Sequence, residues 1–282
     1  AISDLKSGDV YGEIHYLPQR LDFSARFDRK VIYWQTKNSD VTGVAENQKY
    51  SFQKIEAGVS YPFSVRTRIS LRPFLGYTQF VDRGYTSTSS GSGPSTSFAP
   101  SHGQTYTGAK FEIVYDNSIV SGLNMIEGTR GKISAITYNA LGSKKLNFSH
   151  AYIDVRHYQK IYKEIVFAVR GFAGSFFGPS PKSYLLGGVD NWAFNNTNYS
   201  GSTNPLNNAP TTYNSQLLFV EFATSLRGFD YATQYGSSAA VANAEIRVPI
   251  VRALSSGPIT SNFFRNLQFT GFYDIGSAWT GA

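Results

Sequence analysis

One arginine and two carboxylates have the residue types and the spacing to form an ion-paired cluster. Arg227, followed by Gly228 and Phe229, lies in a long polar segment, and Glu245 and Asp274 lie in the two alternating stretches that come next. Two acids on one face of neighbouring strands repel each other, so at least one of them needs a cation. A guanidinium group presents five donors in a fixed fork and can bridge both acids.

A simpler interpretation of the same residues stays open on spacing alone. Arg227 could be a solvated loop charge, while the two acids pair with Arg247 or with water. Gly228 favours the buried arrangement, because a glycine lets the backbone turn sharply inside a crowded interior.

Other side chains that could do chemistry lack supporting partners. The chain has no cysteine and only four histidines, isolated from one another and without ligand spacing, so we expect no metal site and no cofactor. Carboxylates are present on several strands, but no Ser-His-Asp arrangement accompanies them, and we therefore expect no enzymatic activity. The histidines are His15, His102, His150 and His157, and the carboxylates in question are Glu112, Asp154 and Glu164.

The elements that must position these residues are strands. In residues 20–35, for example, Leu21 and Phe23 alternate with Asp22 and Ser24, and a period of two indicates a strand with one apolar and one polar face. Ordinary strands average five or six residues, whereas strands that span a bilayer need 9–11 or more. The same alternation predicts ten strands, at 9–16, 20–35, 48–61, 66–83, 104–115, 127–141, 144–158, 162–176, 239–250 and 264–279.

Two segments without periodicity separate some of these strands. Residues 84–103 and 177–236 are rich in Ser, Gly, Thr, Asn and Pro, which indicates loops. An irregular segment as long as 177–236 is uncommon within a compact domain unless it is functional or disordered. Short turns that alternate with long loops are typical of outer-membrane barrels.

Composition narrows the class of protein. Only 16% of the residues are charged while 15% are aromatic, and no stretch approaches 18 consecutive apolar residues, so no transmembrane helix is expected. These values suit a membrane β-barrel and a secreted sandwich about equally. The formal net charge is +7, but lysine and arginine are scattered singly along the strands, and nucleic-acid binding is not expected.

Four sequence elements in a fixed order resemble a known family. The chain is similar to the C-terminal barrel of the Omp85 superfamily, which comprises outer-membrane insertases and two-partner secretion transporters. The resemblance covers about the last hundred residues, and upstream only the strand pattern agrees. The elements are Leu186-Gly187-Gly188, Ser225-Leu226-Arg227-Gly228-Phe229, Asn243-Ala244-Glu245-Ile246-Arg247-Val248-Pro249-Ile250 and Gly271-Phe272-Tyr273-Asp274-Ile275-Gly276-Ser277-Ala278-Trp279.

The resemblance implies an all-β fold, an antiparallel transmembrane barrel of 16 strands in full. Its long sixth loop enters the lumen, and the arginine at the loop tip pairs with acids on the next two strands, here Arg227, Glu245 and Asp274. Residues 1–282 are then expected to form an incomplete barrel of about ten strands, with 177–236 as that loop. The remaining strands and the periplasmic domains are expected on parts of the molecule outside this sequence.

The sequence departs from the family pattern at two places. Leu226 stands where valine is commoner, which matters little. The glycines Gly187 and Gly188 normally sit close before the Arg-Gly motif, whereas here a polar insert of about 191–220 intervenes and leaves open how the loop packs.

The function implied by the resemblance is insertion of proteins into the bacterial outer membrane or translocation of polypeptide across it. The expected partners are an unfolded or exported polypeptide, the outer-membrane lipid, and periplasmic domains or accessory subunits. A passive channel whose basic lumen selects anions is the alternative. A soluble sandwich is a third interpretation, which fails if the protein needs detergent.

Overall fold

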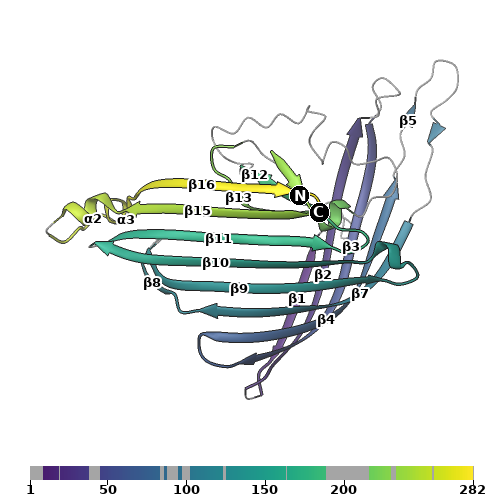
Figure 1. Ribbon diagram of the computed structural model, residues 1–282, viewed down its shortest axis with the longest axis horizontal. Helices are drawn as coiled ribbons and strands as arrows, with labels where there is room; N and C mark the ends of the chain where they lie inside the picture. Colours follow the sequence, from purple (N-terminus) through teal and green to yellow (C-terminus); the bar gives the residue numbers. More distant parts are fainter. Residues whose placement is uncertain are drawn as a thin grey trace.

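The computed structural model describes residues 9–18, 20–37, 45–82, 86–87, 95–96, 102–122, 125–162, 164–188, 216–229, 233–255 and 257–281. One large antiparallel sheet dominates it (Figure 1). Its strands follow the order β1-β2-β3-β4-β7-β9-β10-β11-β15-β16, with β8 paired to β9 at the side. These strands are β1 (Val10–Tyr16), β2 (Asp22–Lys37), β3 (Ala45–Pro62), β4 (Thr67–Asp82), β7 (His102–Asp116), β8 (Ile119–Gly122), β9 (Met125–Ala140), β10 (Phe148–Tyr162), β11 (Ile165–Phe177), β15 (Ser238–Val248) and β16 (Phe269–Trp279).

The ten strands predicted from alternation correspond to the ten strands of this path, and the structure corrects several of their ends. Residues 144–146 form a short 3-10 helix, so β10 begins at Phe148 and continues to Tyr162, through the turn expected at Gln159 and Lys160. β9 is continuous through Gly128 and Gly131, although glycine weakens a strand. Ladder hydrogen bonds to the neighbours on both sides outweigh the weak strand preference of these glycines.

The last predicted strand, at 264–279, begins five residues too early, because β16 begins at Phe269. β15 ends at Val248, and the connection to β16 contains the short helices α2 (Ile250–Leu254) and α3 (Asn262–Asn266). The apolar residues of this connection do not alternate with polar ones, so neither face of a strand would be uniformly apolar there. Residues 264–268 are therefore not part of β16.

Each strand pairs with its neighbour in a register that separates polar and apolar faces. Ile69, Ile113, Ile133, Ile153 and Ala173 lie directly opposite one another on five neighbouring strands. One residue further along, Ser60, Ser70, Glu112, Ser134 and Tyr152 form the equivalent row on the other face. Because side chains alternate along a strand, adjacent rows point to opposite faces of the sheet.

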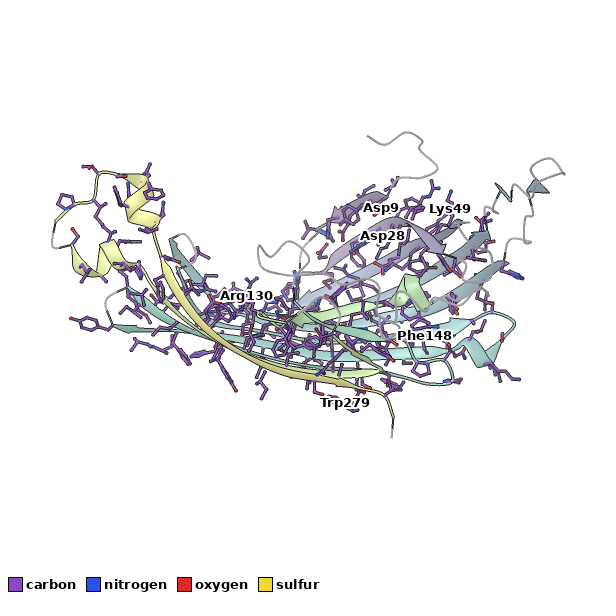
Figure 2. All side chains as sticks on the ribbon, turned by 90° about the horizontal axis from the view of Figure 1, so that it is seen from above. Asp9, Asp28, Lys49, Arg130, Phe148 and Trp279 are labelled. Carbon is purple, nitrogen blue, oxygen red and sulfur yellow. The ribbon has the colours of Figure 1, made fainter. Side chains whose placement is uncertain are left out.

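The polar face is the buried one. Glu56, Glu112 and Ser134 are nearly inaccessible, whereas Ile55 and Ile153 on the apolar face remain widely exposed. The sheet is curved, and Figure 2 shows the flank with Asp28 and Lys49 on one side of the curve and the flank with Trp279 on the other. A soluble sandwich buries its apolar face against a second sheet, and no such sheet covers this face within the described residues. The described part of the chain therefore does not have the arrangement of a sandwich.

A smaller set of elements packs against the concave face. Residues 177–236 were expected to be irregular, but their described part contains β12 (Tyr184–Gly187), the helical turn α1 (Gln216–Phe219), β13 (Glu221–Ser225) and β14 (Gln234–Gly236). The three strands form their own sheet in the order β13-β12-β14, which we call the inner sheet. Most of the expected loop at 84–103 lies outside the described residues. Its described part contains β5 (Thr86–Ser87) and β6 (Ser95–Thr96), which pair with each other, and the beginning of β7 at His102.

The long sheet is open in the described chain, since β1 and β16 form the two ends of the strand order and do not pair with each other. No helix among the described residues is long and apolar enough to cross a membrane.

Candidate functional site

Arg227 lies where the inner sheet meets the last two strands of the large sheet. Its Nε and Nη2 donate to the two carboxylate oxygens of Asp274 at 2.8 Å each, and its backbone N–H donates to Asp274 Oδ2 at 2.9 Å. Its Nη1 donates to Glu245 Oε2 at 2.6 Å. One guanidinium thus bridges both acids, as the fork geometry allows. We call Arg227, Glu245 and Asp274 the Arg227 cluster.

Glu245 has two cationic partners, Arg227 and Arg247, so the predicted bridge by Arg227 and the alternative pairing with Arg247 both occur. Its Oε1 accepts from Arg247 Nε at 2.5 Å, while its Oε2 accepts from Arg227. Asp274 is more enclosed: its side chain is 1% exposed, against 18% for Glu245. Asp274 therefore depends on Arg227 far more than Glu245 does.

Strand register explains how the sequence builds the cluster. Asn243 on β15 lies opposite Asp274 on β16, and Glu245 lies opposite Phe272. All four side chains therefore point to one face, spaced by two residues along each strand. The Arg227 guanidinium lies over the Phe272 ring, 4.0 Å from its centroid, which adds a cation–π contact to the ion pairs.

The cluster keeps its arginine charged. Hydrogen bonds to Asp274, helped by those to Glu245, hold the pKa of Arg227 above its usual range against the opposing effect of burial. The charge of Arg227 is therefore permanent over the whole range of pH in which a protein folds.

Gly228 is needed for its backbone conformation and not for lack of space around it. Its φ of +89° lies in the left-handed region, which favours glycine. A Cβ atom at this position would meet nothing within 4 Å, so the crowding expected around it is absent. The turn redirects the chain after Arg227, and Phe229, whose side chain is about half exposed, follows with its N–H directed at Leu226 O, 3.4 Å away.

The double glycine lies beside the arginine motif in space despite the insert between them in sequence. β12 and β13 pair in parallel with Gly187 opposite Ser225, and Leu226 N–H donates to Gly187 O at 2.8 Å. Gly187 and Gly188 are both buried. Residues 191–215 of the insert lie outside the described residues.

The inner sheet is attached to the wall at further points. Tyr184 of β12 forms a hydrogen bond with His150 of β10, and its ring lies against Gly174 of β11, where any larger side chain would collide with it. Arg170 of β11 hydrogen-bonds Thr224 of β13 and also pairs with Asp154, 2.8 Å from Nη2 to Oδ2. Together with the Arg227 cluster, these contacts hold the segment against four wall strands, β10, β11, β15 and β16.

Aromatic packing supports the same attachment. Phe219 of α1 contacts the rings of Tyr138 and Phe148 at centroid distances of 5.2 and 4.9 Å. Lys182 is almost completely buried beside them, with its ammonium 4.9 Å from the Phe148 ring and 3.1 Å from Ser180 Oγ.

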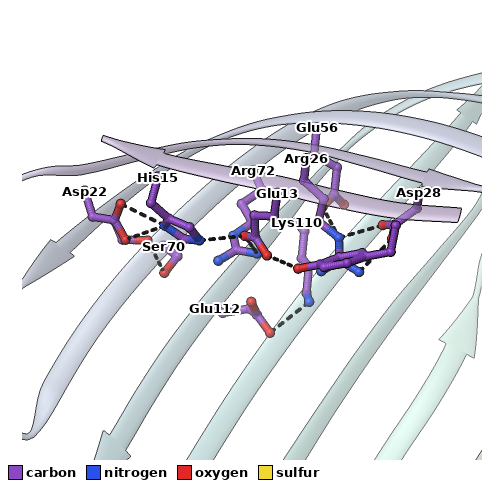
Figure 3. Close-up of polar contacts among 12 residues, drawn as sticks. Glu13, His15, Asp22, Arg26, Asp28, Glu56, Ser70, Arg72, Lys110 and Glu112 are labelled. Carbon is purple, nitrogen blue, oxygen red and sulfur yellow. Dashed lines mark hydrogen bonds and ion pairs between the residues drawn. The ribbon is translucent and has the colours of Figure 1, made fainter. Parts of the chain in front are cut away.

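A second ionic network lies on the first strands of the sheet (Figure 3). Arg26 pairs with Asp28 at 2.7 Å and Lys54 with Glu56 at 2.7 Å. His15 lies between Glu13 and Asp22 at 3.1 Å from each. Acids and bases alternate throughout this network, which makes it a structural feature of the wall and not a second candidate site.

Three contributors to the site were not singled out from the sequence. Asn243, Phe272 and Arg170 all follow from the alternation rule, because each lies two residues from another interior side chain or on the interior face of its strand. Phe272, for example, precedes Asp274 by two residues and so had to share its face.

Comparisons with known proteins complete the description. No protein-family model matches the sequence, and no curated protein matches it. Among solved structures, the chain is similar to BamA from Haemophilus ducreyi lacking POTRA domains 1-3, with a TM-score of 0.55 over 96% of this chain. The fold is that of the BamA barrel. The sequences are 12% identical and the chain spans 49% of that structure, so the similarity establishes the fold alone.

Proposed function

We propose that this chain forms the barrel of a bacterial outer-membrane protein that inserts other proteins into that membrane or passes polypeptide across it. The observation that carries the proposal is the Arg227 cluster within a BamA-type sheet. In this arrangement an arginine from an inserted segment bonds acids on two successive strands, at 2.6 to 2.9 Å. The family resemblance of the motifs and the similarity of the fold were obtained independently and support the same proposal.

The two faces of the sheet support a location in the outer membrane. Exposed aliphatic side chains such as Ile133 and Ile275 cover the convex face, and buried charged groups such as Glu56 and Glu112 lie on the concave face. Lipid-facing apolar and lumen-facing polar residues alternate in this way in outer-membrane barrels. An apolar surface of this extent in water would favour association.

The proposed role is mechanical and involves no enzymatic reaction. The Arg227 cluster holds the inner sheet against β15 and β16, and the inner sheet occupies part of the interior. A polypeptide substrate, outer-membrane lipid, and periplasmic domains or accessory subunits are the proposed partners. Whether the substrate is inserted or secreted depends on those partners.

Depletion of the protein in its own bacterium tests the proposal. We expect the outer membrane to lose folded β-barrel proteins, or the medium to lose one secreted polypeptide, and a plasmid copy of the wild-type gene to restore either. Unchanged levels of both after depletion would contradict the proposal.

A passive channel is the second candidate, favoured by the arginines Arg130, Arg156 and Arg170 that adjoin one another on the interior wall. Steady anion-selective conductance in planar bilayers, combined with no effect of depletion on other outer-membrane proteins, would support the channel instead.

A further inference from the structure

The concave wall carries three arginines directly opposite one another on adjacent strands. Arg156 of β10 faces Arg130 of β9 on one side and Arg170 of β11 on the other. Like charges at directly opposite positions destabilise a sheet. The row, which we call the arginine row, continues through Asn243 to Asp274 of the Arg227 cluster.

Each acid that pairs with the arginine row is less exposed than the arginines it pairs with: Asp116 is 37% exposed, and Asp154 is less exposed than both of its partners. Asp154 accepts from Arg156 at 3.0 Å and from Arg170 at 2.8 Å, and Asp116 pairs with Arg130 at 2.9 Å. Asp154 is 15% exposed, whereas the side chains of Arg156 and Arg130 are 39% and 49% exposed. The charge presented to the interior is therefore positive.

Two hollows in the wall share Arg156 as a lining residue. Their volumes are about 220 and 200 Å³, and Arg227 also lines the first. Cations outnumber acids around both hollows, and seryl, threonyl and amide groups supply further polar atoms. The cationic side chains are Arg130, Lys132, Arg156, Arg170, Arg227 and Arg247, and the acidic ones are Asp116, Asp154 and Glu245.

On β2 and β3, the register places Arg26 directly opposite Glu56 and Lys54 directly opposite Asp28, so these cations face acids across the strands. The arginine row instead shares Asp154 between two guanidinium groups. A wall built only for stability would not place three cations in register with so few partners.

The arginine row lies near the middle of the strands. Arg170 is the sixth of the 13 residues of β11 and Arg156 is the ninth of the 15 residues of β10, so both are slightly nearer the end where a short turn joins these two strands. The long segment that carries the inner sheet leaves β11 at the opposite end. The Arg227 cluster lies level with the arginine row, because Arg170 is opposite Asn243, which is opposite Asp274.

We propose that the arginine row binds the carboxylate groups of an acidic polypeptide segment in the interior. This proposal rests on the proposed function, since it identifies the chemistry of the polypeptide that the barrel handles. Guanidinium groups bind carboxylates through paired hydrogen bonds, and guanidinium groups that are more exposed than their acids can exchange part of their contacts for those of a ligand. Small oxyanions share this chemistry, and the experiment below distinguishes them from a polypeptide.

Binding of a fluorescent oligoglutamate peptide to the purified protein in phosphatidylcholine vesicles tests the proposal. We expect the wild type to bind oligoglutamate and not oligolysine, and Arg130→Gln combined with Arg156→Gln to weaken binding about tenfold or more. Lys144→Gln combined with Lys145→Gln is the matched control. It removes the same charge from an exposed turn at the other end of β9 and β10 and should leave binding unchanged.

The charge-conserving pair Arg130→Lys and Arg156→Lys guards against a folding defect and should retain more binding than the glutamine pair, although lysine lacks the paired donors of a guanidinium group. Equal binding of both peptides, or equal loss in the control variant, would overturn the proposal. Complete displacement of oligoglutamate by an equal concentration of inorganic phosphate would overturn the assignment of a polypeptide ligand. The binding measurement does not depend on protein assembly in cells, so failure of the proposed function shows separately, in the depletion experiment.

Discussion

Asp274 and Glu245 differ in how completely they depend on Arg227. Asp274 accepts three hydrogen bonds from Arg227, one from its backbone N–H and two from its guanidinium group, and is almost inaccessible to water. Glu245 retains Arg247 as a second partner. A charge left unpaired in a buried site costs several kcal/mol, whereas one that keeps a partner costs much less.

The first prediction compares the two acids. Asp274→Asn should lower the free energy of unfolding by about 2–3 kcal/mol, because it leaves the Arg227 side chain without its main counter-charge. Glu245→Gln should cost about 1 kcal/mol, since Arg227 keeps Asp274. Urea titration followed by heat-modifiable gel mobility measures both. Equal costs for the two substitutions would contradict the unequal roles.

The second prediction concerns pH and Lys182. Burial lowers the pKa of Lys182 to about 8, against 10.5 for a free lysine, although the cation–π contact with Phe148 counteracts this. Between these pH values the unfolded chain binds the proton and the folded protein does not. Stability should therefore rise with pH from about 8 to 10.5, by at most about 3 kcal/mol from this group.

Lys182→Met is the matching variant, because it keeps the length of the side chain without the charge. It should be at least as stable as the wild type at pH 7 and should lack this part of the rise. Urea midpoints at pH 7.5 and pH 10 provide the comparison. A rise of the same size in both proteins would show that Lys182 does not titrate as its burial requires.

At the scale of the elements, the inner sheet connects the Arg227 cluster to the wall strands β10 and β11. β12 contributes Tyr184, which reaches His150 and lies on Gly174, and β13 leads directly into Arg227. The parallel pairing of β12 with β13 therefore joins the double glycine, the arginine motif and β11 into one unit.

The third prediction tests the contact between β12 and the wall. Gly174→Val places side-chain atoms where the Tyr184 hydroxyl lies, so we expect the segment between β11 and β15 to become more sensitive to protease. Gly171→Val on the same strand is the control, because a Cβ atom there meets nothing within 4 Å. Similar protease sensitivity in both variants would mean that the inner sheet does not depend on this contact.

The sequence predicts the long strands well and the inner sheet not at all. Alternation over 10 or more residues places Glu245 and Asp274 on one face, because a period of two leaves no other register. β12 and β13 are too short for a periodic signal, and their parallel pairing joins residues on either side of a long polar insert. Such a pairing depends on tertiary packing that no local pattern contains.

Local sequence patterns also fail to determine where some elements begin and end. The non-alternating apolar residues of the connection between β15 and β16 are compatible with a strand or a helix, and only the structure places α3 before Phe269. The register of the arginine row was likewise out of reach, since cross-strand partners depend on turn lengths at both ends of β9, β10 and β11.

At the scale of the whole molecule, polar side chains line the concave face and apolar side chains cover the convex face, the reverse of the distribution in a water-soluble protein. The fourth prediction is that Ile153→Arg on the convex face lowers stability in lipid vesicles by about 2–4 kcal/mol. Arg156→Ala on the concave face should cost less than about 1 kcal/mol, since Asp154 keeps Arg170 and a repulsion between neighbours is relieved. Refolding yields in vesicles measure both. A larger cost for Arg156→Ala than for Ile153→Arg would contradict the assignment of the two faces.

The central claim is that Arg227, held by Asp274 and Glu245, is required for the proposed handling of polypeptide. The most direct measurement is the amount of folded outer-membrane protein, or of secreted polypeptide, in cells whose only copy carries Arg227→Ala. We predict a reduction of about tenfold or more while the variant itself is still present in the membrane, because Asp274 loses its only arginine partner in the described structure. Wild-type levels in these cells, with the variant present, would contradict the claim.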